Sequence, residues 1–248
     1  GEGYCSRVYS CKNGEMSLLH SIPCYHSPAY YYAYVTKLLG FKPLRHEGKI
    51  TGLAAYGNPV EVVKILKTFI SFNVSTLRFE NTGGYHLEAI SRLEKQLSDH
   101  SKEDIAAGIQ FWTEELVSKY VGNIVKQFGV SKEENIFLAG GMFANVKINQ
   151  KILETSNVKN IYIFPNMGDG GLGLGAALSV RKKNIVLGNV YLGKLYTDND
   201  IELELVKKEI EFHKSNNIAS EVAVALSEGK VVARYLGRME YGPRALGH

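Results

Sequence analysis

The sequence predicts an α/β fold, and three observations along the chain support it. From residue 135 onward, two short apolar runs each lead into a glycine cluster and then into a helical pattern. This alternation of strand, loop and helix is typical of α/β domains with a parallel sheet. A long amphipathic helical pattern precedes this region, and a β-hairpin pattern opens the chain. The 248 residues, 45% of them hydrophobic and 22% charged, suffice for one large core or two smaller ones.

The chain opens with a predicted β-hairpin that is followed by an aromatic helix. Residues 6–10 and 16–20 are strand-like, and Asn13-Gly14 between them is a strong turn signal. Ser27-Pro28 then predicts a helix start, and apolar residues at helical spacing continue to a stop at Gly40. The tyrosines of this helix are expected to pack in the core, with stacking on a ligand as the alternative.

The next segments are less periodic. Residues 45–59 place three glycines beside Lys49 and other charged residues, which favours a site loop over the alternative of an exposed turn. A helix over residues 60–72 is expected to follow, and then a strand and turn over residues 73–87 with Gly83-Gly84 as the turn.

A long amphipathic helix is predicted to begin at Ser101. Asp104 lies three residues later in a capping-box-like start, apolar residues recur at helical spacing, and Gly129 closes the pattern. Trp112 falls on the apolar stripe, so we expect it in the core, and a ligand platform is the alternative.

In the α/β region, a strand over residues 135–139 is predicted to lead into a helix over residues 143–155. A second strand over residues 160–164 is predicted to lead into a helix over residues 173–181. Each glycine cluster follows the carboxyl end of a strand, which is where open α/β sheets bind ligands. Seven of the 25 glycines lie between residues 140 and 175. The glycine excess therefore falls at the predicted ligand edge of the sheet.

The composition becomes more polar after residue 182, which predicts a domain boundary between residues 184 and 195. A helix over residues 217–228 and a strand over residues 230–235 are expected beyond it. The chain begins and ends within motif-like sequence and lacks an initiator methionine, so we expect it to be a fragment.

Charge and cysteine usage narrow the class of protein. The net charge of +4 is spread along the chain, and this disfavours a nucleic-acid partner, which usually needs a clustered basic face. Three cysteines are too few for a disulfide scaffold and predict reduced thiols in the cytoplasm. Neither a membrane span nor a secretory signal is expected, because the sequence shows no apolar run of the necessary length.

The first candidate motif follows the strand over residues 135–139. Paired glycines, Gly140 and Gly141, let a ligand approach the backbone, and the following helix offers free N–H groups. Asn145 and Asn149 lie four residues apart and therefore share one helical face. A nucleotide site and tight packing of the helix on the strand both fit this motif; the Gly-Lys-Ser/Thr ending of a P-loop is absent.

The second candidate motif follows the strand over residues 160–164 and places Asp169 among glycines, with Gly168 directly before it. Such a carboxylate meets little competition from neighbouring side chains and can face a divalent cation. An aspartate that only organises the turn is the alternative. The histidines of this chain do not show the spacing of a complete metal site.

The third candidate motif carries Arg238 and Arg244 on a turn rich in glycine and proline after the strand over residues 230–235. Two arginines placed in this way can form a rigid fork for a phosphate or a carboxylate. A structural salt bridge to Glu240 is the alternative.

Four sequence runs together resemble the carbamoyltransferase family of nodulation protein U and the antibiotic-tailoring O-carbamoyltransferases. They occur in the family's order and cover nearly the whole chain. The runs are E-G-K-I-T-G-L-A-A-Y-G at 47–57, L-A-G-G-M-F-A-N-V at 138–146, P-N-M-G-D-G-G-L-G-L-G-A-A at 165–177 and G-R-M-E-Y-G-P-R-A-L-G at 237–247. Where the family usually continues with asparagine after the last run, this chain has His248.

The resemblance implies a fold and a division into domains. Residues 1–185 would be the second half of an actin/sugar-kinase/Hsp70-type, ribonuclease H-like domain that performs carbamoyl transfer. Residues 186–248 would begin a domain similar to the threonylcarbamoyl-adenylate synthases, in which carbamoyl-adenylate is made from ATP and carbamoyl phosphate. The family's paired metal histidines would precede residue 1, so the 248 residues alone are expected to be inactive.

The resemblance also implies roles for particular residues. Asp169 matches the family's aspartate ligand for a divalent metal, iron or similar. The expected nucleotide contacts are Lys49, Gly140, Gly141, Asn145 and Gly168, and the expected contacts to carbamoyl phosphate or the adenylate are Arg238 and Arg244.

The implied ligands are ATP, carbamoyl phosphate and a small hydroxyl-bearing acceptor, and a homodimer is included among the expected partners. A non-catalytic nucleotide-binding module of the actin/Hsp70 superfamily is the alternative from another class of protein. A transferase of the tRNA threonylcarbamoyl type is a further alternative, which the absence of a basic stripe disfavours.

Overall fold

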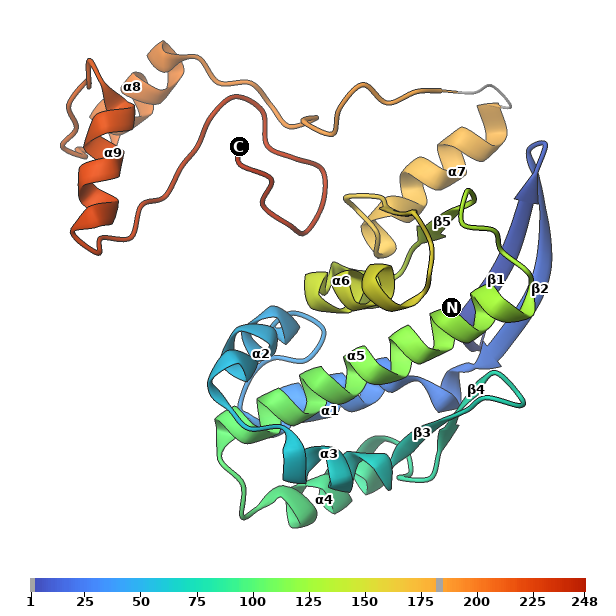
Figure 1. Cartoon of the computed structure of the whole chain (residues 1–248). Helices are drawn as coiled ribbons and strands as arrows, with labels where there is room; N and C mark the ends of the chain where they lie inside the picture. Colours follow the sequence, from blue (N-terminus) through green and yellow to red (C-terminus); the bar gives the residue numbers. More distant parts are fainter. Residues whose placement is uncertain (1–2, 182–184) are drawn as a thin grey trace. The chain divides into compact units, whose positions relative to one another are not determined.

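The structure is a computed structural model that describes residues 3–181 and 185–248. The chain divides into two compact units, unit 1 up to Ile163 and unit 2 from Phe164 to His248 (Figure 1). Both helices and small sheets are present, which confirms the α/β class. The predicted domain boundary between residues 185 and 186 lies within unit 2, and the two assigned domains stay predictions. Among the described helices, none has the length and apolar character that crossing a bilayer requires.

Unit 1 opens with the predicted hairpin. Strands β1 (Tyr4–Lys12) and β2 (Glu15–Pro23) pair antiparallel. The two turn residues, Asn13 and Gly14, have φ angles of 53° and 82°. Positive φ at both central positions is the conformation that two-residue hairpin turns require, and asparagine followed by glycine adopts it readily. The turn chemistry read from the sequence therefore sets the hairpin.

The aromatic helix is also confirmed as α1 (Pro28–Leu38), which follows the short 3₁₀ turn η1 (Cys24–His26). It ends where Gly40 takes a φ of 84° and the Phe41 N–H donates to the Thr36 carbonyl. A left-handed residue just past the last turn is the usual way to end a helix, and glycine adopts that conformation without strain. The tyrosines Tyr31, Tyr32 and Tyr34 are buried, so they pack in the core as expected.

Helix α5 (Lys102–Gln127) is the central element of unit 1. The Ser101 hydroxyl accepts the Asp104 N–H at 3.1 Å, as the capping pattern predicted. The helix packs against α1, α3 (Val60–Lys67) and α6 (Val146–Thr155), and Figure 1 shows α3 and α6 on different sides of it. Trp112 is buried and donates to the Ile70 carbonyl at 3.1 Å. The core position predicted for this tryptophan is confirmed.

Strands β5 (Asn135–Leu138) and β6 (Asn160–Ile163) pair in parallel, with Asn135 opposite Asn160 and Leu138 opposite Ile163. This confirms the strand–helix–strand order read from the sequence. Between them, α6 begins three residues later than predicted, because residues 141–144 form the 3₁₀ turn η3 (Gly141–Ala144) and Asn145 caps the helix.

Two predictions for residues 45–72 were wrong in part, and one helix within residues 86–97 was missed. The predicted loop over 45–59 contains helix α2 (Glu47–Leu53) and the 3₁₀ turn η2 (Ala54–Tyr56), because Ile50 is fully buried and anchors a helical turn. The helix from Val60 stops at Lys67, and the residues after it form a hairpin of β3 (Ile70–Asn73) and β4 (Arg78–Asn81). Helix α4 (His86–Leu97) was not predicted; its buried face carries Ala89, Leu93 and Leu97.

Unit 2 contains the 3₁₀ turn η4 (Asp169–Gly171) and helices α7 (Leu172–Arg181), α8 (Asp198–Lys207) and α9 (Ile218–Ser227). Helices α7 and α9 match the predictions. Helix α8 was missed, although Thr197 and Asp200 form a complete capping box at its start.

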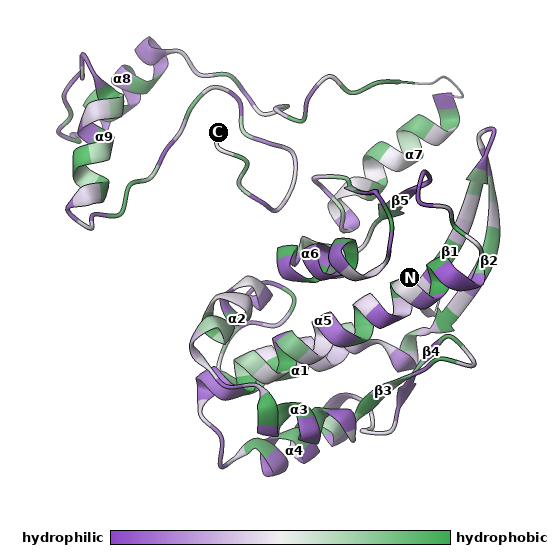
Figure 2. Ribbon diagram, in the orientation of Figure 1, coloured by the Kyte–Doolittle hydropathy of each residue, from purple (hydrophilic) through white to green (hydrophobic). Residues whose placement is uncertain are grey.

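The predicted strand over residues 230–235 was wrong, because a strand needs a hydrogen-bonded neighbour and the described residues provide none. Hydrophobic residues lie on α9 and on the segment after it (Figure 2). Among them, Val224 and Val231 are exposed.

Candidate functional site

The loop after β5 presents bare backbone, as the first motif predicted. Gly140 has a φ of 117°, a conformation that favours glycine, and Gly141 begins the 3₁₀ turn η3. Apart from the two chain neighbours of each glycine, no heavy atom of the described residues lies within 4 Å of the position that a Cβ would take there. A ligand can therefore approach this backbone closely at the carboxyl end of the strand.

Asn145 follows this loop and is the N-cap of α6. Its Oδ1 accepts the N–H groups of Lys147 at 3.1 Å and of Ile148 at 3.3 Å. Its Nδ2 donates to the Gln110 Oε1 at 2.8 Å, and the Gln110 Nε2 donates back to the Asn145 Oδ1 at 3.3 Å. Because these bonds occupy the carboxamide, the backbone of the loop is the part most open to a ligand. The role of Asn145 as a nucleotide contact stays a prediction.

Gln110 lies on α5, is only 5% exposed and connects four elements of unit 1. The Tyr32 hydroxyl of α1 donates to its Oε1 at 2.6 Å, and the Thr51 hydroxyl of α2 lies 3.0 Å from the Tyr32 hydroxyl. The Gln110 Nε2 also donates to Glu114 at 2.7 Å. We call Tyr32, Thr51, Gln110, Glu114 and Asn145 the Gln110 cluster. A buried polar network whose members satisfy one another holds its elements in one arrangement.

The ionisation of Tyr32 agrees with its part in this cluster. Burial raises the pKa of its hydroxyl to about 12, the nearby carboxylates of Glu47 and Glu114 raise it as well, and the Thr51 hydrogen bond opposes them. Tyr32 therefore remains protonated at neutral pH and can donate to Gln110.

Asn149, the second asparagine of the motif, supports the same loop from inside. Its Nδ2 donates to the Phe143 carbonyl at 2.8 Å. Its Oδ1 is buried and has no hydrogen-bond partner among the described residues. The geometry thus gives Asn149 a structural contact to η3.

Lys49 lies on α2 with an exposed side chain, and its Nζ lies 5.6 Å from the centre of the Phe41 ring. Thr51, two residues further on, is the residue by which α2 joins the Gln110 cluster. The structure therefore brings the motif at 47–57 to the same unit as Gly140 and Gly141, whereas a contact of Lys49 with a nucleotide stays a prediction.

In unit 2, the second motif forms a tight loop over residues 164–171, which we call the Asp169 loop. The Gly171 N–H donates to the Gly168 carbonyl at 3.0 Å, and a Cβ at Gly171 would overlap the Asn166 carbonyl oxygen. The Asp169 side chain is exposed, and none of the described residues hydrogen-bonds to it or forms an ion pair with it. Its carboxylate is therefore available to a ligand.

The third motif occupies unit 2 as well. The Arg238 Nη1 donates to the Gly193 carbonyl at 2.9 Å, and the Arg244 side chain is exposed. Glu240 accepts the Leu246 N–H, and this hydrogen bond is the main cause that lowers the pKa of its carboxyl. Among the described residues no ion pair joins Glu240 to either arginine, so the alternative of a structural salt bridge is not formed.

Sequence reasoning missed several residues that the structure brings to these loops. The Gln110 cluster contains Tyr32, Thr51, Gln110 and Glu114, and unit 2 adds Tyr241, whose hydroxyl donates to the Gly170 carbonyl. One signal was present for Gln110, since a polar residue on the apolar stripe of a long helix must find a partner when buried. No local signal distinguished Tyr241.

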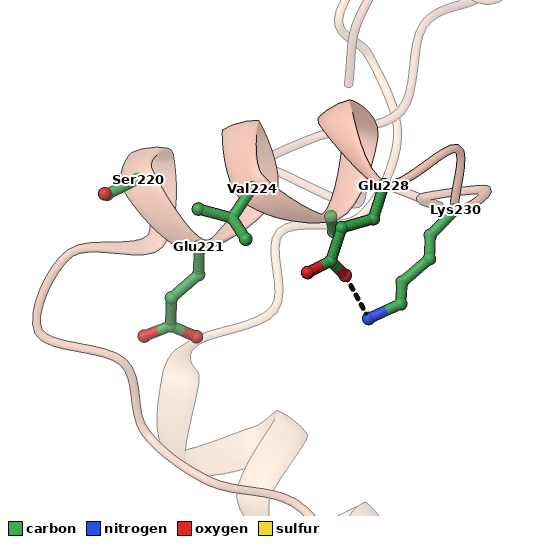
Figure 3. Close-up of a pocket in the computed structure, with 6 residues that line it drawn as sticks. Ser220, Glu221, Val224, Glu228 and Lys230 are labelled. Atoms are coloured by element: carbon green, nitrogen blue, oxygen red, sulfur yellow. Dashed lines mark ion pairs between the residues drawn. The ribbon is translucent and has the colours of Figure 1, made fainter.

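The described residues contain no group of three or more His, Cys, Asp or Glu side chains placed to hold a metal ion. Asp169 could therefore supply one oxygen ligand, but the His, Cys, Asp and Glu side chains of the described residues do not complete a site of three such ligands around it. A surface hollow on α9, lined by residues that include Glu221, Glu228 and Lys230, is shown in Figure 3. None of the predicted site residues lines it, so it does not enter the candidate site.

Comparison with known proteins gives an independent result. The family model described as "Carbamoyltransferase N-terminus" matches residues 1–178. An uncharacterized protein of Methanocaldococcus jannaschii is 34% identical over 238 residues, which cover 88% of this chain and 38% of that protein.

Two nodulation proteins of Sinorhizobium fredii match as well. Nodulation protein NolNO is 28% identical over 262 residues, which cover 100% of this chain and 38% of that protein. Nodulation protein U is 31% identical over 156 residues, which cover 61% of this chain and 27% of that protein. The chain thus spans less than half the length of these relatives.

Proposed function

Because the chain belongs to the carbamoyltransferase family, we propose that it forms part of an enzyme that carbamoylates a hydroxyl group of a small acceptor. The proposed donor is carbamoyl-adenylate, made from ATP and carbamoyl phosphate. Family membership supports carbamoyl transfer in general. The proposal goes further in three respects: the nucleotide is ATP, the intermediate is carbamoyl-adenylate, and the acceptor is a small molecule with a hydroxyl group.

The open backbone at Gly140 and Gly141 is the observation that carries the nucleotide part. It lies at the carboxyl end of a strand, and the Gln110 cluster fixes the helix that follows it. Fixed backbone groups can bind phosphate or ring atoms without a cost of ordering at the moment of binding. Lys49 and Gly168 are proposed as further nucleotide contacts.

The exposed carboxylate of Asp169 supports the metal part of the proposal. A carboxylate oxygen suits a hard divalent cation, and iron also accepts carboxylate ligands. Such an ion, when bound, would offset negative charge on phosphate oxygens. In this chain Asp169 would contribute one ligand, and the remaining ligands would come from outside the described residues.

The proposed architecture is that of the actin/Hsp70-type domain for residues 1–185 and of an adenylate-forming domain that begins at residue 186. The parallel β5–β6 pair with helix α6 supports the first part. Arg238 and Arg244 are proposed to bind carbamoyl phosphate or the adenylate, since the guanidinium group suits phosphate oxygens.

Titration calorimetry of the full-length protein that contains this chain, with Mn²⁺ and with ATP, tests the proposal. Asp169→Ala is expected to weaken Mn²⁺ binding by about tenfold or more, because even the loss of a residue that only supports a metal ligand costs about 10–100-fold. Asp198→Ala, which removes another exposed aspartate of unit 2, serves as the matched control and is expected to leave both affinities unchanged.

Three outcomes separate the candidate functions. Carbamoyl-adenylate detected by mass spectrometry after incubation of the full-length protein that contains this chain with ATP and carbamoyl phosphate would support the enzyme. ATP binding without a metal and without any adenylate would favour a non-catalytic nucleotide-binding module. Metal and ATP affinities that Asp169→Ala leaves unchanged would contradict the role assigned to this aspartate.

A further inference from the structure

We infer that Tyr241 and Gly242 are positioning residues, which hold the Asp169 loop against the segment that carries Arg238 and Arg244. Phosphate binding at the arginines is then expected to order the Asp169 loop, and metal binding at Asp169 is expected to order the segment that carries the arginines. The inference rests on the proposed function for the roles of Asp169 and the arginines. The contacts that carry it all lie within unit 2.

Tyr241 holds the end of the Asp169 loop. Its hydroxyl donates to the carbonyl oxygen of Gly170, the residue that follows Asp169 in the chain. Gly170 belongs to the 3₁₀ turn η4, from which α7 continues. A hydrogen bond at this carbonyl fixes the peptide next to the Asp169 backbone, and so it limits where the carboxylate can lie.

The same two residues also hold the start of the loop. The Tyr241 ring packs edge-on against the Phe164 ring, with the ring centres 6.2 Å apart. Gly242 has a φ of 150°, and a Cβ there would overlap the Pro165 carbonyl oxygen, so only glycine permits this approach. Tyr241 and Gly242 thus contact the loop at both ends.

The segment that carries Arg238 is itself fixed within unit 2. The Tyr241 N–H donates to the Val190 carbonyl at 2.7 Å, and the Gly193 N–H donates to the Met239 carbonyl at 3.0 Å. Arg238 joins this set through its hydrogen bond to Gly193. The backbone between Arg238 and Gly242 is therefore tied on one side to residues 190–193 and on the other to the Asp169 loop.

A chain of contacts thus runs from Arg238 through Tyr241 to the peptide beside Asp169. Coupling between two sites requires an element whose arrangement both ligands influence. The segment from Arg238 to Gly242 is such an element, because it contacts the loop directly and carries one of the two arginines.

Hydrogen–deuterium exchange of the amides of residues 168–172 tests this inference, with inorganic phosphate as the probe for the arginines. In the unaltered chain, phosphate is expected to slow the exchange of these amides. In Tyr241→Phe, which removes only the hydroxyl, their exchange is expected to rise by about fivefold, as for loss of one hydrogen bond. The protection by phosphate is expected to disappear in this variant.

Two further variants complete the test. Gly242→Ala keeps the hydroxyl but pushes against Pro165, and it is expected to raise the exchange in the same way. Tyr235→Phe removes a hydroxyl elsewhere in unit 2 that makes no hydrogen bond among the described residues, and it is expected to behave as the unaltered chain. The Mn²⁺ affinity of Tyr241→Phe is measured alongside and is expected to fall about fivefold. Loss of a contact that is only structural would leave the Mn²⁺ affinity unchanged.

The inference is overturned if exchange of residues 168–172 is the same in Tyr241→Phe as in the unaltered chain. It is also overturned if phosphate protects these amides equally in both. Failure of the proposed function is a separate result, because it is read from metal and nucleotide affinities that Asp169→Ala leaves unchanged.

Discussion

The two glycine-rich loops of this chain are held in place by different means. The loop after β5, at Gly140 and Gly141, is followed by a helix cap that belongs to the partly buried Gln110 cluster. The Asp169 loop, which begins directly after β6, is exposed at its acidic residue and is held by a tyrosine hydroxyl and a close backbone approach. Similar sequence motifs at equivalent places along the chain therefore owe their order to different interactions.

This difference indicates how each loop would respond to change. A buried polar cluster is satisfied only as a whole, so the removal of one member leaves others without partners at a high cost. An exposed loop held by a few contacts loses only those contacts, because water can replace them. We therefore expect substitutions in the Gln110 cluster of unit 1 to lower the free energy of unfolding strongly. Substitutions at the Asp169 loop of unit 2 are expected to change only the local order of that loop.

The largest expected effect comes from Gln110→Leu, which keeps the volume of the side chain but removes its amide. Tyr32 loses a partner in a buried setting, and Asn145 and Glu114 each lose one in a partly buried setting. We expect a loss of about 2–3 kcal/mol in the free energy of unfolding, measured by urea denaturation followed by circular dichroism.

Gln127→Leu is the matched control for this variant. Gln127 lies on the same helix, and its exposed side chain makes no hydrogen bond among the described residues. Its replacement is expected to change the free energy of unfolding by less than about 0.5 kcal/mol. Equal losses in the two variants would show that the Gln110 cluster does not stabilise unit 1 in the way we describe.

A smaller effect is expected from Asn145→Ala, which removes the helix cap and one member of the cluster. Loss of an N-cap alone costs about 1 kcal/mol. A double-mutant cycle with Gln110→Leu measures how strongly the two residues depend on each other, and we expect a coupling energy of about 1–2 kcal/mol. Purely additive effects would mean that the cap and the cluster act independently.

The smallest effect is expected from pH, through Asp104 at the start of α5. The Asn58 N–H, which donates to this carboxylate at 2.6 Å, is the main cause that lowers its pKa, and the Ser101 hydroxyl contributes. A lowered folded-state pKa adds stability that is present above the unfolded pKa and is lost as the pH falls through the folded value.

Asp104→Asn should therefore lower the urea midpoint at pH 7, and the difference should shrink below about pH 4. Asp169→Asn is the comparison in the Asp169 loop, because no described residue donates to the Asp169 carboxylate. The urea midpoint of Asp169→Asn should equal that of the unaltered chain at both pH values. A difference at Asp104 that does not depend on pH would exclude the charge as its cause.

Elements with strong local signals were predicted from the sequence. The hairpin turn at Asn13-Gly14, the cap at Ser101 and the alternation of strands and helices from residue 135 each depend on residues close together in the chain. Two of the errors fell where distant contacts decide, whereas helix α8 was missed despite a local capping box at its start. Burial of Ile50 makes a helix of the expected loop, and residues 230–235 remain without a strand partner among the described residues.

The same division applies to the candidate site. The open glycines and the available carboxylate of Asp169 were read from composition and position, because they depend on what neighbouring side chains lack. Gln110 and Tyr241 were not found, because each acts on a residue far away in the sequence. Gln110 meets Asn145 across 35 positions and Tyr241 meets Gly170 across 71.

The sequence alone determined the α/β class, the places where the backbone lies open, and a resemblance whose family the comparisons confirm. These properties follow from local chemistry, namely turn residues, caps, periodicity and glycine content. Only the tertiary structure decided what fixes each loop. Such contacts join residues that are distant in sequence. They form because polar groups that lose water on folding need partners within the folded chain, and because two backbone segments can come close only where side chains leave room.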